Sequence, residues 1–143
     1  MSPHRCLITG GLGYIGTALT ERMRTIEPQS DICLFDIDCH DRRSSLPSDV
    51  VDLHWHGDIL DRDNLEQAIS AFAPTHVIHL AAVHYIPQCE SDPALTHSVN
   101  VIGTRNVIEV AQKYPSVSRI VFASSGAVYA SSQNYGDSAL NCR

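Results

Sequence analysis

Three glycines, at residues 10, 13 and 16, constrain the fold of this chain more than any other feature. They follow a short apolar run, Cys6–Ile8, and open a stretch whose apolar residues recur at helical spacing. In such a strand-to-helix turn, Gly10 permits a tight turn, Gly13 lets the backbone approach a pyrophosphate, and Gly16 lets the helix pack closely on the strand. The context therefore predicts a dinucleotide-binding loop, with a glycine-rich turn that binds nothing as the alternative.

An acidic residue stands where the same fingerprint requires one. Asp36 lies twenty positions after Gly16 and directly follows a second apolar run, Asp31–Phe35. A carboxylate there accepts hydrogen bonds from a ribose 2′-hydroxyl and repels a 2′-phosphate, so it predicts NAD rather than NADP as cofactor. Arg42 and Arg43 leave the NADP alternative open, because on a polar loop they could reach a phosphate.

Apolar strand-like runs alternate with helix-period stretches, which is typical of parallel βαβ units. The predicted strands are Cys6–Ile8, Asp31–Phe35, Val50–His56, Val77–Ala81 and Ile120–Ala123. The predicted helices are Ile15–Ile26, Asp61–Phe72, and a long one from Pro93 up to Pro115. Right-handed crossovers then give an α/β fold, a Rossmann-type doubly wound parallel sheet of strand order 3-2-1-4-5, truncated after its fifth strand.

The composition limits what the chain can do. Its 143 residues correspond to about one domain, 1–143, in which 130–143 form an atypical or poorly ordered tail. The net charge is −6 and the basic residues are scattered, which argues against nucleic acid or a membrane as partner. No apolar run approaches the ~18 residues of a membrane span and no signal peptide is recognisable, so we expect a cytoplasmic, soluble protein.

The cysteines and histidines predict neither disulfides nor a metal site. Five cysteines are an odd number without a C-x-x-C pair, which favours a reducing compartment and small core residues. They are Cys6, Cys33, Cys39, Cys89 and Cys142. His54 and His56 would share one face of their strand, but no Cys or carboxylate lies nearby at a usual ligand spacing.

Further short segments accompany the glycine loop and Asp36. They are Gly57-Asp58-Ile59, His79-Leu80-Ala81-Ala82, Asn100-Val101 with Gly103-Thr104, and Ser124-Ser125-Gly126-Ala127-Val128-Tyr129. With them, residues 5–129 resemble the extended short-chain dehydrogenase/reductase family, the NAD-dependent epimerase/dehydratases that include UDP-glucose 4-epimerase. Together these segments are far more specific than the glycines alone.

The resemblance implies a set of cofactor-binding residues. Asp58 and Ile59 would border the adenine, Ala81 and Ala82 would pass beneath the dinucleotide, and Asn100 would fix the following helix near the nicotinamide. Asp58 has a second interpretation, as the cap of the next helix, and His79 is expected to be a packed strand residue rather than a base. The full implied set is Gly10, Gly13, Tyr14, Ile15, Gly16, Asp36, Asp58, Ile59, Leu80, Ala81, Ala82, Asn100 and Ser124.

The resemblance implies one catalytic group and leaves another missing. Ser125 aligns with the family's catalytic serine, whose hydroxyl polarises the substrate oxygen during hydride transfer. The family's general base is a Tyr in a Tyr-x-x-x-Lys pair, but Lys113 is the only lysine and residue 109 is Glu. Gly126 and Ala127 stand where the dehydratase branch has an Asp-Glu pair, which lowers that interpretation. His84 lies where the epimerase branch tends to have a Lys.

Two functional hypotheses follow. The first is an NAD-binding domain of an extended-family oxidoreductase or epimerase for a nucleotide sugar or a similar hydroxyl or keto substrate. Such a chain would be inactive alone, since it lacks the general base and the substrate-binding region. The second is a non-catalytic NAD(H)-binding or interaction module. In either case, we expect an apolar edge along Ile120–Ala123 and self-association through it.

Overall fold

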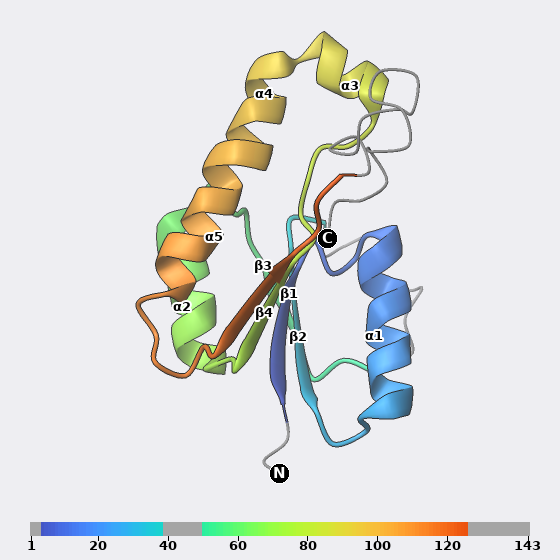
Figure 1. Cartoon of the computed structure of the whole chain (residues 1–143), viewed down its shortest axis with the longest axis vertical. Coiled ribbons are helices and arrows are strands. Elements are labelled where there is room, and N and C mark those ends of the chain that lie inside the picture. The colour runs from blue at the N-terminus through green and yellow to red at the C-terminus, as the bar shows by residue number, and fades with distance from the viewer. Residues whose placement is uncertain (1–3, 39–49, 126–143) are drawn as a thin grey trace, which may run out of the picture.

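The structure, a computed structural model, describes residues 4–38 and 50–125. Within these residues, parallel strands form one sheet in the order β3-β2-β1-β4-β5 (Figure 1). The strands are β1 (Arg5–Thr9), β2 (Asp31–Asp36), β3 (Leu53–His56), β4 (His76–His79) and β5 (Arg119–Phe122). The predicted α/β fold and strand order are confirmed.

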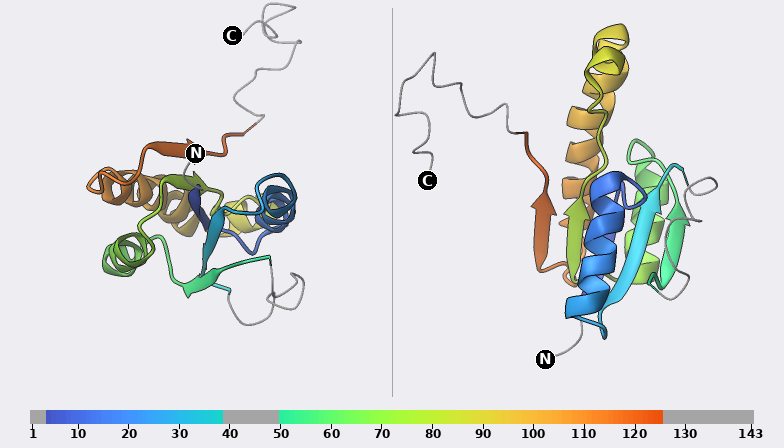
Figure 2. Two further views of the ribbon diagram at one scale, coloured as in Figure 1. Left: turned by 90° about the horizontal axis from the view of Figure 1, so that it is seen from below. Right: turned by 90° about the vertical axis from the view of Figure 1, so that its right-hand side faces the viewer.

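Helices cover both faces of this sheet. They are α1 (Tyr14–Ile26), α2 (Arg62–Phe72), α3 (Ile86–Ser91), α4 (Pro93–His97), the π-helix η2 (Ser98–Gly103) and α5 (Thr104–Ala111). Figures 1 and 2 show α1 on one face and α2 with α5 on the other, while α3 and α4 extend beyond the carboxyl ends of the strands. None of the helices in residues 4–38 and 50–125 has the length and apolar character needed to cross a bilayer.

Two apolar cores lie on opposite faces of the sheet, because successive strand residues point in opposite directions. Leu7 belongs to the core beneath α2 and α5, where it packs with residues such as Phe35 and Val107. The next residue, Ile8, belongs to the core on the α1 side, together with Leu34. All of these side chains are fully buried. This double burial is why the central strands are continuously apolar rather than alternating.

The helix predicted from Pro93 to Pro115 is the main departure from expectation. It begins at Pro93 with Asp92 as its cap, but it widens into the π-helix Ser98–Gly103 and ends at Ala111. The hydrogen bond pattern changes there without a break in the apolar spacing, so periodicity did not reveal it. The short helix Ile86–Ser91 was not predicted either, because its sequence lacks an apolar face.

Two strands are shorter than predicted. β4 ends at His79 rather than at Ala81, and the backbone of Ala81 lies so close to Gly10 that a Cβ there would be 2.6 Å from the nitrogen of Ala81. β3 begins at Leu53 rather than at Val50, whose carbonyl accepts hydrogen bonds from the guanidinium of Arg24 instead. At both places the chain contacts segments that are distant in sequence.

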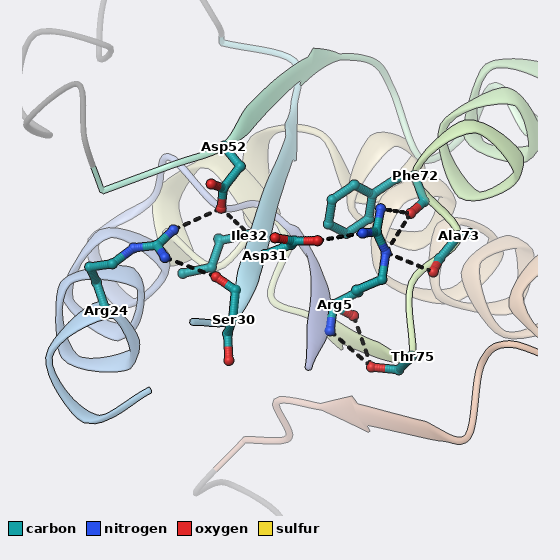
Figure 3. A network of polar contacts seen from close by, with 9 residues as sticks. All are labelled: Arg5, Arg24, Ser30, Asp31, Ile32, Asp52, Phe72, Ala73 and Thr75. Atoms are coloured by element: carbon teal, nitrogen blue, oxygen red, sulfur yellow. Dashed lines mark hydrogen bonds and ion pairs between the residues drawn. The ribbon is translucent and has the colours of Figure 1, made fainter. Parts of the chain in front are cut away.

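Arg5 joins β1 to the end of α2 at the amino ends of the strands (Figure 3). Its guanidinium donates to the carbonyl oxygens of Phe72 and Ala73, pairs with the carboxylate of Asp31, and lies 4.8 Å from the centre of the Phe72 ring. The last carbonyls of a helix lack partners within the helix, so this cation stabilises the C-terminus of α2.

Arg24 makes the corresponding connection for α1 (Figure 3). It donates to the carbonyls of Ser30 and Val50 and pairs with Asp52 at 2.7 Å. The same Asp52 carboxylate accepts the backbone N–H of Ile32 at 2.7 Å. These contacts hold the sheet and both helix layers together at the end opposite the glycine loop.

Candidate dinucleotide-binding site

The glycine loop connects β1 to α1 and lies against the residues that follow β4. Gly10 has φ +67°, and its N–H donates to the carbonyl of Phe35 at 2.9 Å. A Cβ at Gly10 would lie 2.6 Å from the backbone nitrogen of Ala81. Both the left-handed backbone and the close approach require glycine here, which confirms the role expected of Gly10 in the turn.

Gly13 and Gly16 differ in what surrounds them. A Cβ at Gly16 would lie 2.5 Å from the carbonyl oxygen of Gly11, so glycine is needed for the helix to pack on the loop. A Cβ at Gly13 would approach only the oxygen of Gly10, at 3.2 Å, and the φ of Gly13 is −71°. The protein's own backbone therefore crowds a side chain at Gly13 much less than at Gly10 or Gly16, which leaves room for a close approach from outside the protein.

The N-terminus of α1 is open. No described residue accepts a hydrogen bond from the backbone N–H of Tyr14, Ile15 or Gly16, and Gly13 supplies no capping side chain. The side chains next to these amides are large and mainly apolar, yet they are exposed: Tyr14 is 90% and Ile15 is 60% exposed. Free amides at the positive end of a helix, beside uncovered apolar side chains, suit an anionic group attached to a larger flat ligand.

Asp36 lies at the end of β2 and closes one side of this loop. Its carboxylate accepts the N–H of Leu12 at 3.0 Å and the N–H of Asp38 at 3.0 Å. The first of these bonds fixes the carboxylate next to the glycine loop, on the side of β2. Leu12 was not among the predicted residues, and its contribution comes from the backbone, which side-chain patterns do not reveal.

Asp58 and Ile59 follow β3 at the same edge of the sheet. Asp58 is exposed, and its carboxylate accepts the N–H of Leu60 at 2.8 Å. The cap of α2 is Asp61, which accepts the N–H of Asn64 at 3.0 Å, so Asp58 is not the helix cap. Ile59 is only 4% exposed, and its side chain belongs to the core, so most of its surface is unavailable to a ligand.

Ile59 is fixed in position by two residues of the helix opposite. The side-chain N–H of Asn106 donates to its carbonyl at 3.1 Å, and Gly103 leaves the room that its side chain fills. Asn106 is buried and also accepts from Arg62 at 3.0 Å. Nothing in the sequence pattern distinguished Asn106 from an ordinary polar helix residue.

The segment after β4 is held by Asn100. Its side-chain amide accepts the N–H of Val83 and donates to the carbonyl of the same residue, each at 2.8 Å. Leu80 and Ala81 are half-buried and Ala82 is exposed, directly beside the glycine loop. Asn100 thus acts on the backbone that leads away from β4.

His79 is buried at the end of β4. Its Nδ1 lies 2.6 Å from the hydroxyl of Thr9 and its Nε2 lies 2.9 Å from the hydroxyl of Thr104. Burial holds the pKa of His79 below its ordinary value. This is the packed strand residue that the sequence predicted.

Ser124 and Ser125 follow β5 after Ala123, whose N–H still donates to the carbonyl of His79 at 3.1 Å. Both serines are exposed at the edge of the sheet where the glycine loop lies. Arg42, Arg43 and residues 126–143, including Gly126 and Ala127, lie outside the described residues. The predicted residues of β1, β2, β4 and β5 therefore come together at the carboxyl ends of the strands.

The described residues show neither a metal cluster nor an enclosed pocket at this edge. No three His, Cys, Asp or Glu side chains among them lie close enough together to hold a metal ion. Cys6 and Cys33 are buried and Cys89 is half-buried, and none of these three is in a disulfide. A shallow depression beside α2, lined by residues such as Trp55 and Tyr114, shares no residue with the glycine loop.

Comparison with known proteins gives the family. Residues 6–142 match the model of the NAD dependent epimerase/dehydratase family. The chain belongs to this family. It is 34% identical over 131 residues to a decarboxylating sterol-4-alpha-carboxylate 3-dehydrogenase of Saccharomyces cerevisiae, covering 90% of this chain and 36% of that protein. It is 29% identical over 130 residues to the UDP-glucose 4-epimerase of Mycoplasma genitalium, covering 91% and 38%.

Solved structures of the family agree with the fold. The UDP-glucose 4-epimerase of Thermus thermophilus in complex with NAD superposes with a TM-score of 0.75 at 33% identity, covering 85% of this chain and 38% of that one. The Bordetella bronchiseptica enzyme WbmG in complex with NAD and UDP gives 0.72 at 35% identity, covering 90% and 40%. This epimerase/dehydratase domain thus spans about two-fifths of the relatives it matches, and the family's cofactor is NAD.

Proposed function

We propose that this chain binds NAD(H) at the carboxyl ends of β1, β2 and β4, as the cofactor-binding part of an extended short-chain dehydrogenase/reductase. The observation that carries the proposal is the contrast among the glycines. The protein's own backbone leaves no room for a Cβ at Gly10 or Gly16, whereas it crowds Gly13 much less, and Gly13 lies beside the open amides of α1. A pyrophosphate on those amides explains Gly13.

The remaining groups complete the ligand from this point. The Asp36 carboxylate, oriented by the N–H of Leu12, would accept hydrogen bonds from the adenosine ribose and disfavour a 2′-phosphate. Ala81 and Ala82 would border the dinucleotide beside the loop, and Ser125 at the end of β5 would face the nicotinamide side. NAD supplies hydride transfer when bound, and the chain's own residues bind and orient it.

The substrate is proposed by class only. Relatives include proteins named as epimerases of nucleotide sugars and a sterol carboxylate dehydrogenase. The substrates in these names share a carbon that bears a hydroxyl or keto group. We infer that a nucleotide sugar or a similar hydroxyl or keto compound is the substrate of the complete site. Ser125 would polarise its oxygen, and because the chain has no Tyr-x-x-x-Lys pair, we expect no turnover by residues 1–143 alone.

Calorimetric titration of the whole chain with NAD, NADH and NADP tests the cofactor. NAD(H) is expected to bind more tightly than NADP(H), and Asp36→Ala should narrow the difference by removing both the ribose acceptor and the charge. Asp63→Ala removes an equivalent charge from the first turn of α2 and should leave the preference unchanged. NADP binding as tight as NAD binding by the unmodified chain would contradict the assignment of Asp36.

Incubation with NAD and nucleotide sugars tests the lack of turnover. We expect no epimerase or dehydrogenase product above the background without protein. NAD-dependent product formation that Ser125→Ala abolishes would show that a general base exists elsewhere in the chain. Such a result would overturn the expectation of inactivity and leave the cofactor assignment intact.

A further inference from the structure

His79 has both ring nitrogens engaged inside the protein. It is 5% exposed, and its partners are hydroxyls on two other elements, Thr9 at the end of β1 and Thr104 at the start of α5. Thr9 itself is fully buried and directly precedes Gly10. The imidazole therefore connects the strand that leads into the glycine loop with the helix on the opposite layer.

Only one assignment of donors and acceptors satisfies the hydrogen bonds among Thr9, His79 and Thr104. The hydroxyl of Thr104 donates its single hydrogen to the carbonyl of Asn100 at 2.8 Å, so its oxygen must accept from Nε2 of His79. A neutral imidazole then has a bare Nδ1, which accepts the hydroxyl hydrogen of Thr9. In an imidazolium, Nδ1 would also donate, and the hydrogen of the buried Thr9 hydroxyl would lose its acceptor.

We call the hydrogen-bonded series Thr9, His79, Thr104 and Asn100 the relay, and through Asn100 it reaches the segment after β4. Asn100, which receives the Thr104 hydroxyl, lies in the π-helix and holds both backbone groups of Val83 with its side-chain amide. A π-helix inserted in a longer helix is often found at functional sites. Thr9, His79, Thr104 and Asn100 together therefore link the residue before Gly10 to the backbone that continues from Ala82.

We propose that His79 is a positioning residue of the dinucleotide site, neutral and protonated at Nε2, which couples the glycine loop to residues 80–83 through Thr104 and Asn100. This inference rests on the proposed function, because the two coupled segments are those assigned to NAD. The groups that face the ring from β1 and α5 are hydroxyls, and no charged side chain of the described residues contributes to its lowered pKa.

The tautomer is tested without any ligand. Long-range proton–nitrogen NMR correlations on the ¹⁵N-histidine-labelled chain should show His79 as the neutral Nε2–H form at pH 7, with the signal assigned by its loss in His79→Asn. Addition of saturating NAD should lower the pKa of His79 further, because binding and the neutral form favour each other. A ring protonated at Nδ1, or a charged ring at pH 7, would overturn the proposal.

Isosteric variants test the coupling. Thr9→Val and Thr104→Val each remove one hydroxyl of the relay while keeping its volume, and each should weaken NAD binding by about three- to tenfold, the effect of one hydrogen bond. Thr75→Val is the matched control, since its hydroxyl accepts the N–H of Arg5 at 3.0 Å at the opposite end of the same two strands. It should reduce stability and leave NAD affinity unchanged.

The double variant Thr9→Val/Thr104→Val separates a relay from two local effects. Because both hydroxyls act through one imidazole, the combined loss of NAD affinity should be smaller than the product of the single losses. If both single variants bound NAD with wild-type affinity while losing stability as Thr75→Val does, the proposed coupling through His79 would be wrong. The proposed NAD site would stand. An unmodified chain that binds no NAD would contradict the proposed function as well.

Discussion

Substitution by alanine should affect different properties of the protein at Gly16 and at Gly13. Gly16→Ala places a Cβ 2.5 Å from a backbone oxygen, so it should reduce the free energy of unfolding by about 2 kcal/mol or more. Gly13→Ala meets one backbone oxygen at 3.2 Å, a tight contact relieved by a small shift, so it should lower stability less than Gly16→Ala does while weakening NAD binding. Urea unfolding and calorimetry measure the two effects. Unchanged NAD affinity in Gly13→Val, whose side chain is larger, would show that the loop does not hold the pyrophosphate.

Two buried or half-buried histidines make stability depend on pH. The pKa of His79 is lowered by burial, and that of His76 by burial and by the nearby His4 and Arg119. The unfolded chain, with ordinary values near 6.5, therefore binds more protons than the folded chain just below that pH. Stability should be fully present above pH 6.5 and fall as the pH decreases to 5. Urea unfolding at pH 7.5 and pH 5 should show this loss, and His79→Gln should reduce it.

The C-terminus of α2 contains a residue, Ala73, at which glycine should stabilise the protein. Ala73, its C-cap, has φ +48°, a left-handed conformation that glycine adopts without strain. Ala73→Gly should therefore raise the free energy of unfolding by about 0.5–1 kcal/mol. Ala71→Gly, two residues earlier in an exposed helical position, should lower it by about 1 kcal/mol. Urea unfolding would contradict this reasoning if both substitutions changed stability in the same direction.

The elements that were predicted correctly are those whose signals are local. Asp61 and Asp92 cap helices in their own neighbourhood, and the double burial of Leu7 and Ile8 produces an apolar run that is visible in the sequence. The π-helix Ser98–Gly103 could not be predicted, because a change in backbone hydrogen bonding leaves the apolar spacing that marks a helix in the sequence unbroken.

The candidate site shows the same division. The glycines and Asp36 were predictable, since their spacing is set by one strand, one turn and one helix. The contacts that fix the neighbouring groups were not: the N–H of Leu12 orients the Asp36 carboxylate, and the side chain of Asn106 holds the carbonyl of Ile59, both across the fold. For Ile59, the resemblance implies a place beside the adenine, which stays a prediction, and the structure adds that its side chain packs in the core against Gly103.

At the scale of the whole molecule, β5 is the strand with the least cover. It lies at the edge of the sheet, paired only with β4 among the described strands (Figure 2). Val121 and Phe122, which point to opposite faces, are 48% and 57% exposed. Apolar edges of this kind pair with other strands. Self-association of two copies through β5 remains a prediction.

Sedimentation velocity over a range of concentrations measures this association. Val121→Lys places a charge on the apolar edge and should shift the chain toward monomer. Ile26→Lys makes the same kind of change at an apolar residue that is 60% exposed at the end of α1, and it should have no effect on association. A stable monomer at high concentration, with slow exchange of the β5 amides, would contradict the prediction.

The central place of β1 has a consequence for how the protein is made. The ribosome synthesises β1 before both of its neighbours, β2 and β4, and the second of these ends only at His79. Leu7, which pairs with Val77, therefore lacks its β4 neighbour on the nascent chain until about seventy further residues have emerged. Because Gly10 packs on Ala81, the glycine loop is completed only then. NAD can consequently stabilise the assembled sheet but cannot guide the first steps of its folding.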